Sequence, residues 1–266
     1  MSSATVGREP ITVHRSGRRG APVVVLVHGL TDDGLTWPDL VDRWAGTWDL
    51  HALDLRGHGT SPRFTDDELP RTPEVMLDDL LDVLDTQPEP VALVGHSLGG
   101  LLSLRGALAR PAKVRALVLE DPARPHGSRT PAPDFVAAIE GGLDAAARDR
   151  QAEVERMRRE TPWSETEIQA WADSRGRVDR GYVRRGMFLG DGAWEESFGA
   201  LTVPTLLVVP PDAPMAPRPD GFDNPLVRTV VVEGAGHCVR RDRPDAWYAA
   251  VEPFLDGVGA PGASGT

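Results

Sequence analysis

Short apolar runs, most of them rich in β-branched residues, recur along this chain. They occupy residues 23–27, 50–55, 91–94, 116–119, 205–209 and 229–232. Each run is nearly continuous and does not alternate with polar residues, which is typical of strands buried on both faces of a parallel sheet. We therefore predict that these runs are the strands of a sheet covered by helices on both sides.

Between several of these runs, apolar residues recur at helical spacing. Residues 72–84 and 244–255 place apolar side chains three or four positions apart, and residues 98–109 are rich in Leu and Ala and stop before Pro111. Strands that alternate with helices are joined by right-handed crossover connections. The pattern predicts an α/β fold with a mostly parallel, doubly wound sheet.

The alternation of strands and helices is interrupted between residues 123 and 199. This stretch has no convincing strand, and its large apolar side chains include Met157, Trp163, Trp171, Met187, Phe188 and Trp194. We interpret it as helices inserted between two strands. The chain then divides into a core of residues 1–122 and 200–256, an insert of residues 123–199, and a flexible tail rich in Gly and Ala at residues 257–266.

Composition and charge narrow the expected partners. The chain has 266 residues, of which 40% are hydrophobic, as in ordinary globular proteins. Its formal net charge of −11 disfavours nucleic acid and anionic membrane as partners. Cys238 is the only cysteine, so an intrachain disulfide is excluded. We find no secretory signal and no apolar run long enough for a transmembrane helix, and we expect a cytoplasmic protein.

A candidate nucleophile lies where the run at residues 91–94 meets the helix predicted for residues 98–109. The sequence Gly95-His96-Ser97-Leu98-Gly99 fits G-x-S-x-G in the strand–turn–helix setting that gives this motif its meaning. Small residues around Ser97 allow a tight, strained turn that exposes the hydroxyl group at the start of a helix. The alternative is a glycine-rich turn whose serine has no chemical role.

A second glycine loop follows the run at residues 23–27. It begins with His28-Gly29-Leu30, and in a doubly wound sheet it lies beside the turn at Ser97. The N–H groups of Leu30 and Leu98 could together bind an oxyanion. We interpret His28 as a structural, hydrogen-bonded histidine that holds the loop.

His237 is the candidate general base. It follows the run at residues 229–232 within Gly234-Ala235-Gly236-His237. A serine hydroxyl needs a base to accept its proton, and histidine suits this role because it ordinarily titrates near neutral pH. His51, His58 and His126 lack this setting and are interpreted as surface or structural residues. His96 is expected to pack beneath the turn or to line the pocket.

Four segments together resemble the α/β-hydrolase fold family, in its smaller, bacterial esterase-like branch. They are VLVHGL, LDLRGHGTSPR, LVGHSLGG and VEGAGHCVRRDRPDAW. The segments come in the order expected for the family, and the resemblance covers most of the chain except the insert. The resemblance implies that Ser97 is the nucleophile, that His237 is the base and that Leu30 and Leu98 supply oxyanion N–H groups. It also implies that the insert is a helical cap and that Asp54 shapes the core and loops without a catalytic role.

The acid that would orient His237 is where the sequence departs from the family pattern. The usual motif, G-x-x-D after the penultimate strand, has Pro210 and Ala213 at its Gly and Asp positions, and Asp212 lies one residue early. Some proteins that resemble this family, including haloalkane dehalogenases, have the acid at another place, at the end of the strand before the cap. Asp121 holds that position here, so we predict Asp121, with Asp212 and Glu120 as alternatives.

The expected activity is hydrolysis of a small or medium hydrophobic carboxylic ester without a metal or cofactor. A carbon–carbon bond hydrolase, a lactonase or a perhydrolase would use the same three residues. A small-molecule receptor or scaffold without turnover is an alternative of another class.

Overall fold

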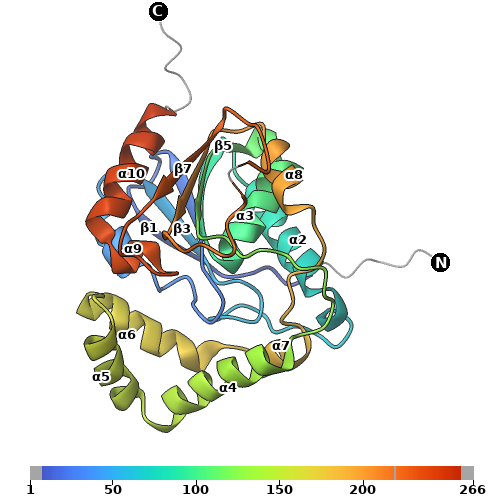
Figure 1. The fold of residues 1–266 in the computed structure, drawn as a ribbon, viewed down its shortest axis with the longest axis vertical. Helices are drawn as coiled ribbons and strands as arrows, with labels where there is room; N and C mark the ends of the chain where they lie inside the picture. Colours follow the sequence, from blue (N-terminus) through green and yellow to red (C-terminus); the bar gives the residue numbers. More distant parts are fainter. Residues whose placement is uncertain (1–7, 219, 259–266) are drawn as a thin grey trace, which may run out of the picture.

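A computed structural model describes residues 8–218 and 220–258, which form a seven-stranded sheet flanked by helices (Figure 1). The strands lie in the order β1-β3-β2-β4-β5-β6-β7. Their bounds are β1 Val13–Gly17, β2 Val23–Val27, β3 Asp49–Leu53, β4 Val91–His96, β5 Val114–Glu120, β6 Thr205–Val209 and β7 Val227–Val231. β1 pairs antiparallel with β3, and the other pairs are parallel. The predicted mostly parallel sheet is confirmed.

Successive side chains of the central strands enter two separate hydrophobic cores. Val25 and Val27 of β2 pack with α2 (Thr72–Asp85) and α3 (Leu98–Ala109), whereas Val24 and Leu26 pack with α1 (Pro38–Trp44) and α10 (Pro244–Gly257). This division follows from the two-residue period of a strand. It explains why the runs are continuously apolar, because both faces of the sheet are buried.

The edge strand β1 and the helix α1 are among the elements that were not predicted from the pattern of apolar residues. β1 has the sequence VHRSG, and it forms at the edge of the sheet by pairing with β3. α1 is a seven-residue helix that starts at Pro38 and buries Leu40 and Trp44. Both elements are too short or too polar to produce a detectable period, so their formation depends on tertiary contacts.

The stretch between β5 and β6 is helical. It contains α4 (Pro133–Arg148), α5 (Arg150–Glu160), α6 (Glu165–Ser174), α7 (Arg180–Arg185) and α8 (Trp194–Gly199), with a 3-10 turn at Arg175–Arg177. The first four helices form an arc across one end of the sheet, and α8 lies apart from them (Figure 1). The four-residue helix α9 (Val239–Asp242) follows β7 and precedes α10.

Parts of the expected chain ends lie outside the described residues. These are residues 1–7 of the expected core and residues 259–266 of the expected tail, while Gly257 is the last residue of α10. None of the described helices is both long and apolar enough to cross a membrane.

Candidate active site

Ser97 occupies a strained turn between β4 and α3. Its φ of 51° and ψ of −115° are rarely adopted by residues other than glycine. A Cβ atom at Gly99 would lie 2.1 Å from the carbonyl oxygen of Val27, and one at Gly95 would lie 2.4 Å from that of Gly99. The two glycines therefore allow the close approach of β2, β4 and α3 that produces the turn. The strained turn predicted at Ser97 is confirmed.

His237 and Asp121 meet at the carboxyl end of the sheet. The Nδ1 atom of His237 lies 2.6 Å from Oδ2 of Asp121. Asp121 directly follows β5, has a φ of 35° and is 2% exposed. Its backbone N–H donates to the carbonyl of Val208 in β6. Since the carboxylate accepts the proton of Nδ1, the neutral ring has its lone pair on Nε2, which leaves that atom available as a base.

The other two candidate acids lie in different surroundings. Asp212 is exposed in the loop after β6, and the described residues show no hydrogen bond between it and His237. Glu120 is buried and accepts the backbone N–H of Arg240 at 2.9 Å. Burial raises the pKa of Glu120 to about 6. Of the three acids, Asp121 is the one that contacts His237.

His96, the last residue of β4, also contacts His237. Its Nε2 atom donates to the carbonyl of His237 at 3.1 Å, and the two ring centroids are 4.8 Å apart. Burial lowers the pKa of His96 well below its usual value, so the ring is neutral near pH 7. This contact, which was not predicted, holds the histidine loop against the turn at Ser97.

The loop after β2 lies against the same turn. Nε2 of His28 accepts the N–H of Leu55 at 3.0 Å, and Nδ1 donates to the carbonyl of Gly29 at 2.7 Å. The structural interpretation of His28 is therefore confirmed. In the described part of the chain, neither the N–H of Leu30 nor that of Leu98 donates to a protein acceptor. Both amides are therefore available for a ligand.

Asp54 organises the neighbouring loops, as expected from the resemblance. Its two carboxylate oxygens accept the backbone N–H groups of Gly34 and Thr60, each at 2.8 Å. Burial would raise the pKa of Asp54, but these hydrogen bonds and His14 lower it, so the group is ionised. It lies outside the cavity described next.

A cavity of about 570 Å³ separates the inserted helices from the sheet. Its lining includes Ser97, His237, Leu30 and Leu98 from the core. The insert contributes mainly apolar side chains, among them Phe135, Ile139, Met157, Trp163, Trp171, Met187 and Phe188. In residues 8–218 and 220–258, no group of three or more His, Cys, Asp or Glu side chains could hold a metal ion.

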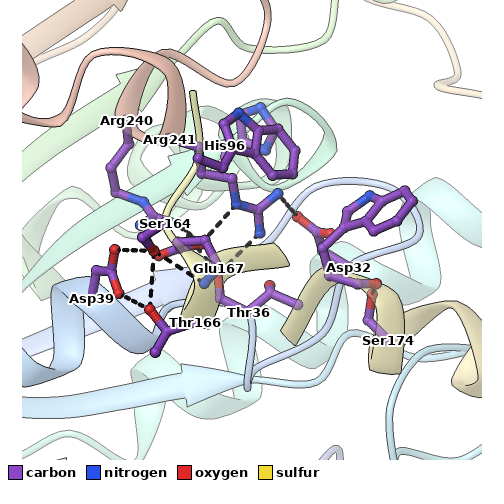
Figure 2. Close-up of polar contacts among 12 residues, drawn as sticks. Asp32, Thr36, Asp39, His96, Ser164, Thr166, Glu167, Ser174, Arg240 and Arg241 are labelled. Atoms are coloured by element: carbon purple, nitrogen blue, oxygen red, sulfur yellow. Dashed lines mark hydrogen bonds and ion pairs between the residues drawn. The ribbon is translucent and has the colours of Figure 1, made fainter. Parts of the chain in front are cut away.

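A buried network of charges joins the insert to the core beside this cavity (Figure 2). Arg240 and Arg241 of α9 both bind the carboxylate of Glu167 in α6, and Arg241 also binds Asp32 at 3.0 Å. Both guanidinium groups donate to the carbonyl of Thr36. This network was not predicted, because adjacent arginines after a loop are typical of an exposed surface.

Comparisons with known proteins agree with this architecture. The model of the alpha/beta hydrolase family matches residues 24–251. Lipase LipV of Mycobacterium tuberculosis is 40% identical over 112 residues, which are 42% of this chain and 41% of LipV. The bovine (lyso)-N-acylphosphatidylethanolamine lipase is 28% identical over 93% of this chain and 83% of its own length.

Solved structures show the same fold. That of the N-formylmaleamic acid deformylase from Pseudomonas putida S16 superposes with a TM-score of 0.71 and 25% identity, covering 90% of this chain and 94% of the deformylase. The family model extends from β2 into α10 and includes the turn at Ser97 and the loop of His237. The chain therefore belongs to the alpha/beta hydrolase family and is a hydrolase.

Proposed function

We propose that this hydrolase cleaves a small or medium hydrophobic carboxylic ester through Ser97, His237 and Asp121. The observation that carries the proposal is the 2.6 Å contact between His237 and Asp121, made where His237 and Ser97 line the same cavity. A serine and a histidine that line one cavity, with a buried carboxylate against the histidine, are the parts of a nucleophilic triad.

In the first half of the proposed reaction, the hydroxyl oxygen of Ser97 attacks the ester carbonyl, and Nε2 of His237 accepts the hydroxyl proton. The carbonyl oxygen becomes an oxyanion that accepts the N–H groups of Leu30 and Leu98. The bond to the alkoxy group then breaks, and His237 gives its proton to the departing alcohol. The acyl group remains on Ser97.

In the second half, water attacks the acyl-enzyme while His237 accepts its proton. The bond to Ser97 then breaks, the hydroxyl regains its proton, and the carboxylic acid leaves. Asp121 accepts the hydrogen bond from Nδ1 in both halves and stabilises the imidazolium that forms twice in the cycle. Because Asp121 is buried and its Oδ2 atom lies 2.6 Å from Nδ1, it holds the imidazole ring in place while Nε2 exchanges the proton.

The preference for a hydrophobic ester rests on the lining of the cavity. Most of the side chains supplied by the insert are aromatic or aliphatic, which suits an apolar acyl or alcohol group. We include in the proposal that residues 123–199 act as a cap over the site. The relatives named as lipases are consistent with ester cleavage.

A fluorophosphonate probe tests the nucleophile directly. We expect covalent labelling of the wild-type protein and of Ser128→Ala, in which a half-buried serine of the insert is replaced, and none of Ser97→Ala. Circular dichroism should show that all three are folded. Lack of Ser97-dependent labelling in folded protein would overturn the proposal and favour the receptor or scaffold alternative.

A substrate panel separates ester cleavage from the related reactions. We expect Ser97-dependent release of p-nitrophenol from short and medium p-nitrophenyl esters. Turnover limited to lactones, to 1,5-diketones and dienone acids, or to peracid formation would instead identify the lactonase, carbon–carbon hydrolase or perhydrolase alternative. All of these require the same triad, so the labelling experiment alone does not distinguish them.

A further inference from the structure

Few charged side chains enter the mainly apolar cavity. Asp32, Arg175 and Arg241 are the acidic and basic residues among its lining, apart from histidines. A charge next to apolar walls is costly unless an opposite charge or hydrogen bonds compensate it. The partners of these three residues therefore indicate what the cavity is built to bind.

Asp32 and Arg241 compensate each other. Their side chains form an ion pair at 3.0 Å, and Arg241 also binds Glu167 at 2.9 Å (Figure 2). Glu167 is shared with Arg240, which leaves this carboxylate bound to two guanidinium groups. The acidic groups beside the cavity are thus already engaged within the network.

Arg175 has no such partner. Among the described residues, no carboxylate lies within ion-pair distance of its guanidinium group, and its Nε atom is buried without a hydrogen-bond partner. Its contacts are a hydrogen bond from Nη1 to the hydroxyl of Thr31 and the face of Trp171, 4.4 Å from the guanidinium carbon. Burial lowers the pKa of Arg175, and the nearby charge of Asp32 offsets only part of this effect.

The position of Arg175 is set from both sides. It begins the 3-10 turn directly after α6, and Ser174 before it donates to the carbonyl of Thr31 at 3.0 Å. Thr31 follows Leu30, whose N–H is part of the proposed oxyanion site. Arg175 is therefore held next to the loop that would bind the reacting carbonyl oxygen.

We propose that Arg175 binds a carboxylate carried by the substrate, so that the preferred substrates are esters with a free carboxylate a few carbon atoms from the reacting carbonyl. A planar guanidinium group binds carboxylates through charge-assisted hydrogen bonds. The apolar walls then hold the carbon chain between the two ends. This inference rests on the proposed ester hydrolysis at Ser97.

The test compares two p-nitrophenyl esters that differ in one charge. The first is the mono-p-nitrophenyl ester of adipic acid, and the second is its neutral methyl ester. We expect wild-type kcat/KM to be about tenfold to a hundredfold higher for the anionic ester, as for a hydrogen-bonded charge. Arg175→Met should remove this preference, so that its kcat/KM values for the anionic and the neutral ester agree within about twofold.

Two further variants control for indirect effects. Arg177 lies in the same turn, but its guanidinium group binds Asp33 and does not line the cavity. Arg177→Met should therefore keep the preference for the anionic ester. Arg175→Lys keeps the charge without the planar group and should retain part of the preference. Equal kcat/KM for both esters in the wild type, or an unchanged preference in folded Arg175→Met, would overturn the inference and leave the proposed function intact.

Tryptophan fluorescence can measure the binding of adipate and so tests the carboxylate site even if the protein cleaves no ester. If no ester is cleaved in a Ser97-dependent manner, the proposed function fails. Saturable binding of adipate that is weakened at least tenfold by Arg175→Met would still support the carboxylate site. Binding that is absent, or equal in both proteins, would then overturn it.

Discussion

At the residue scale, backbone conformation selects the proposed acid. Asp121 has a positive φ directly after β5, and this turn brings its carboxylate to His237. Glu120, one residue earlier, binds the backbone of Arg240 instead. Asp121 lies beyond the end of β5, so this turn, and not the alternation of side chains along an extended strand, separates the two acids.

Replacing Asp121 with Asn should reduce kcat by roughly 10³- to 10⁴-fold, because an amide does not hold the histidine in the required tautomer. Asp212→Asn is the matched control and should keep nearly full activity, since Asp212 is exposed. Steady-state kinetics on a p-nitrophenyl ester measure both. A large loss in Asp212→Asn with little effect at Asp121 would assign the acid to Asp212.

His58 should make stability depend on pH. It is buried between His28 and Tyr182, and burial, followed by the charge of His28, lowers its pKa to about 3. The unfolded chain takes up a proton below about pH 6.5, whereas the folded protein does not until about pH 3. The free energy of unfolding should therefore fall as the pH decreases through this range.

Urea unfolding at pH 7.5 and 5.0 measures this contribution. Between pH 7.5 and 5.0, the free energy of unfolding should fall by about 2 kcal/mol more in the wild type than in His58→Phe. This follows from a slope of about 1.4 kcal/mol for each pH unit below the pKa of an unfolded histidine. Replacement of the exposed His126 by Gln is the control and should follow the wild type. Identical losses in wild type and His58→Phe would show that His58 does not titrate differently in the two states.

At the element scale, α6 and α9 are joined by buried charges. Glu167 from the insert lies between Arg240 and Arg241 from the core, and all three side chains are nearly inaccessible to solvent. A second contact, between Ser164 before α6 and Asp39 in α1, lies nearby at the surface (Figure 2). These contacts fix one edge of the proposed cap.

Glu167→Gln should lower the free energy of unfolding by about 3 kcal/mol, because it leaves buried arginine charges without their shared partner. Glu165→Gln on the same helix removes an exposed ion pair with Arg158 and should change the free energy of unfolding little. Urea unfolding gives both values. Equal stability of the two variants would mean that Asp32 and the carbonyl of Thr36 suffice to compensate the arginines.

At the scale of the whole molecule, the site forms between two parts of the chain. The sheet supplies Ser97, Asp121 and His237 at the ends of three strands, and the inserted helices supply most of the apolar lining. The volume of the cavity, about 570 Å³, is in the usual range for small-molecule sites. Substrate size should therefore be limited by the insert.

A series of p-nitrophenyl esters should show this limit. We expect kcat/KM to rise from acetate to a medium acyl chain, by up to about fourfold for each buried CH₂ group, and to fall for palmitate. The rise reflects burial of the chain, and the fall reflects a chain longer than the cavity. A continued rise to palmitate would indicate that the acyl chain leaves the cavity through an open groove.

Much of the fold and part of the site could be predicted from the sequence. The runs at residues 23–27 and 205–209 coincide with β2 and β6, and α3 begins and ends where predicted. The turn at Ser97 was also predicted correctly, because its glycines and its strand–helix setting are local in sequence. β1 and α1 were missed, because their residues adopt regular structure only through contacts with distant segments.

The sequence by itself determined the strand–helix alternation, the strained serine turn and the histidine loop, since each depends on the period or backbone freedom of neighbouring residues. Only the tertiary structure decided which acid contacts His237, because Asp121 is 116 positions away in the chain. It likewise decided that Glu167 binds two arginines while Arg175 has no acidic partner among the described residues. Such pairings depend on distances between segments that sequence spacing does not encode.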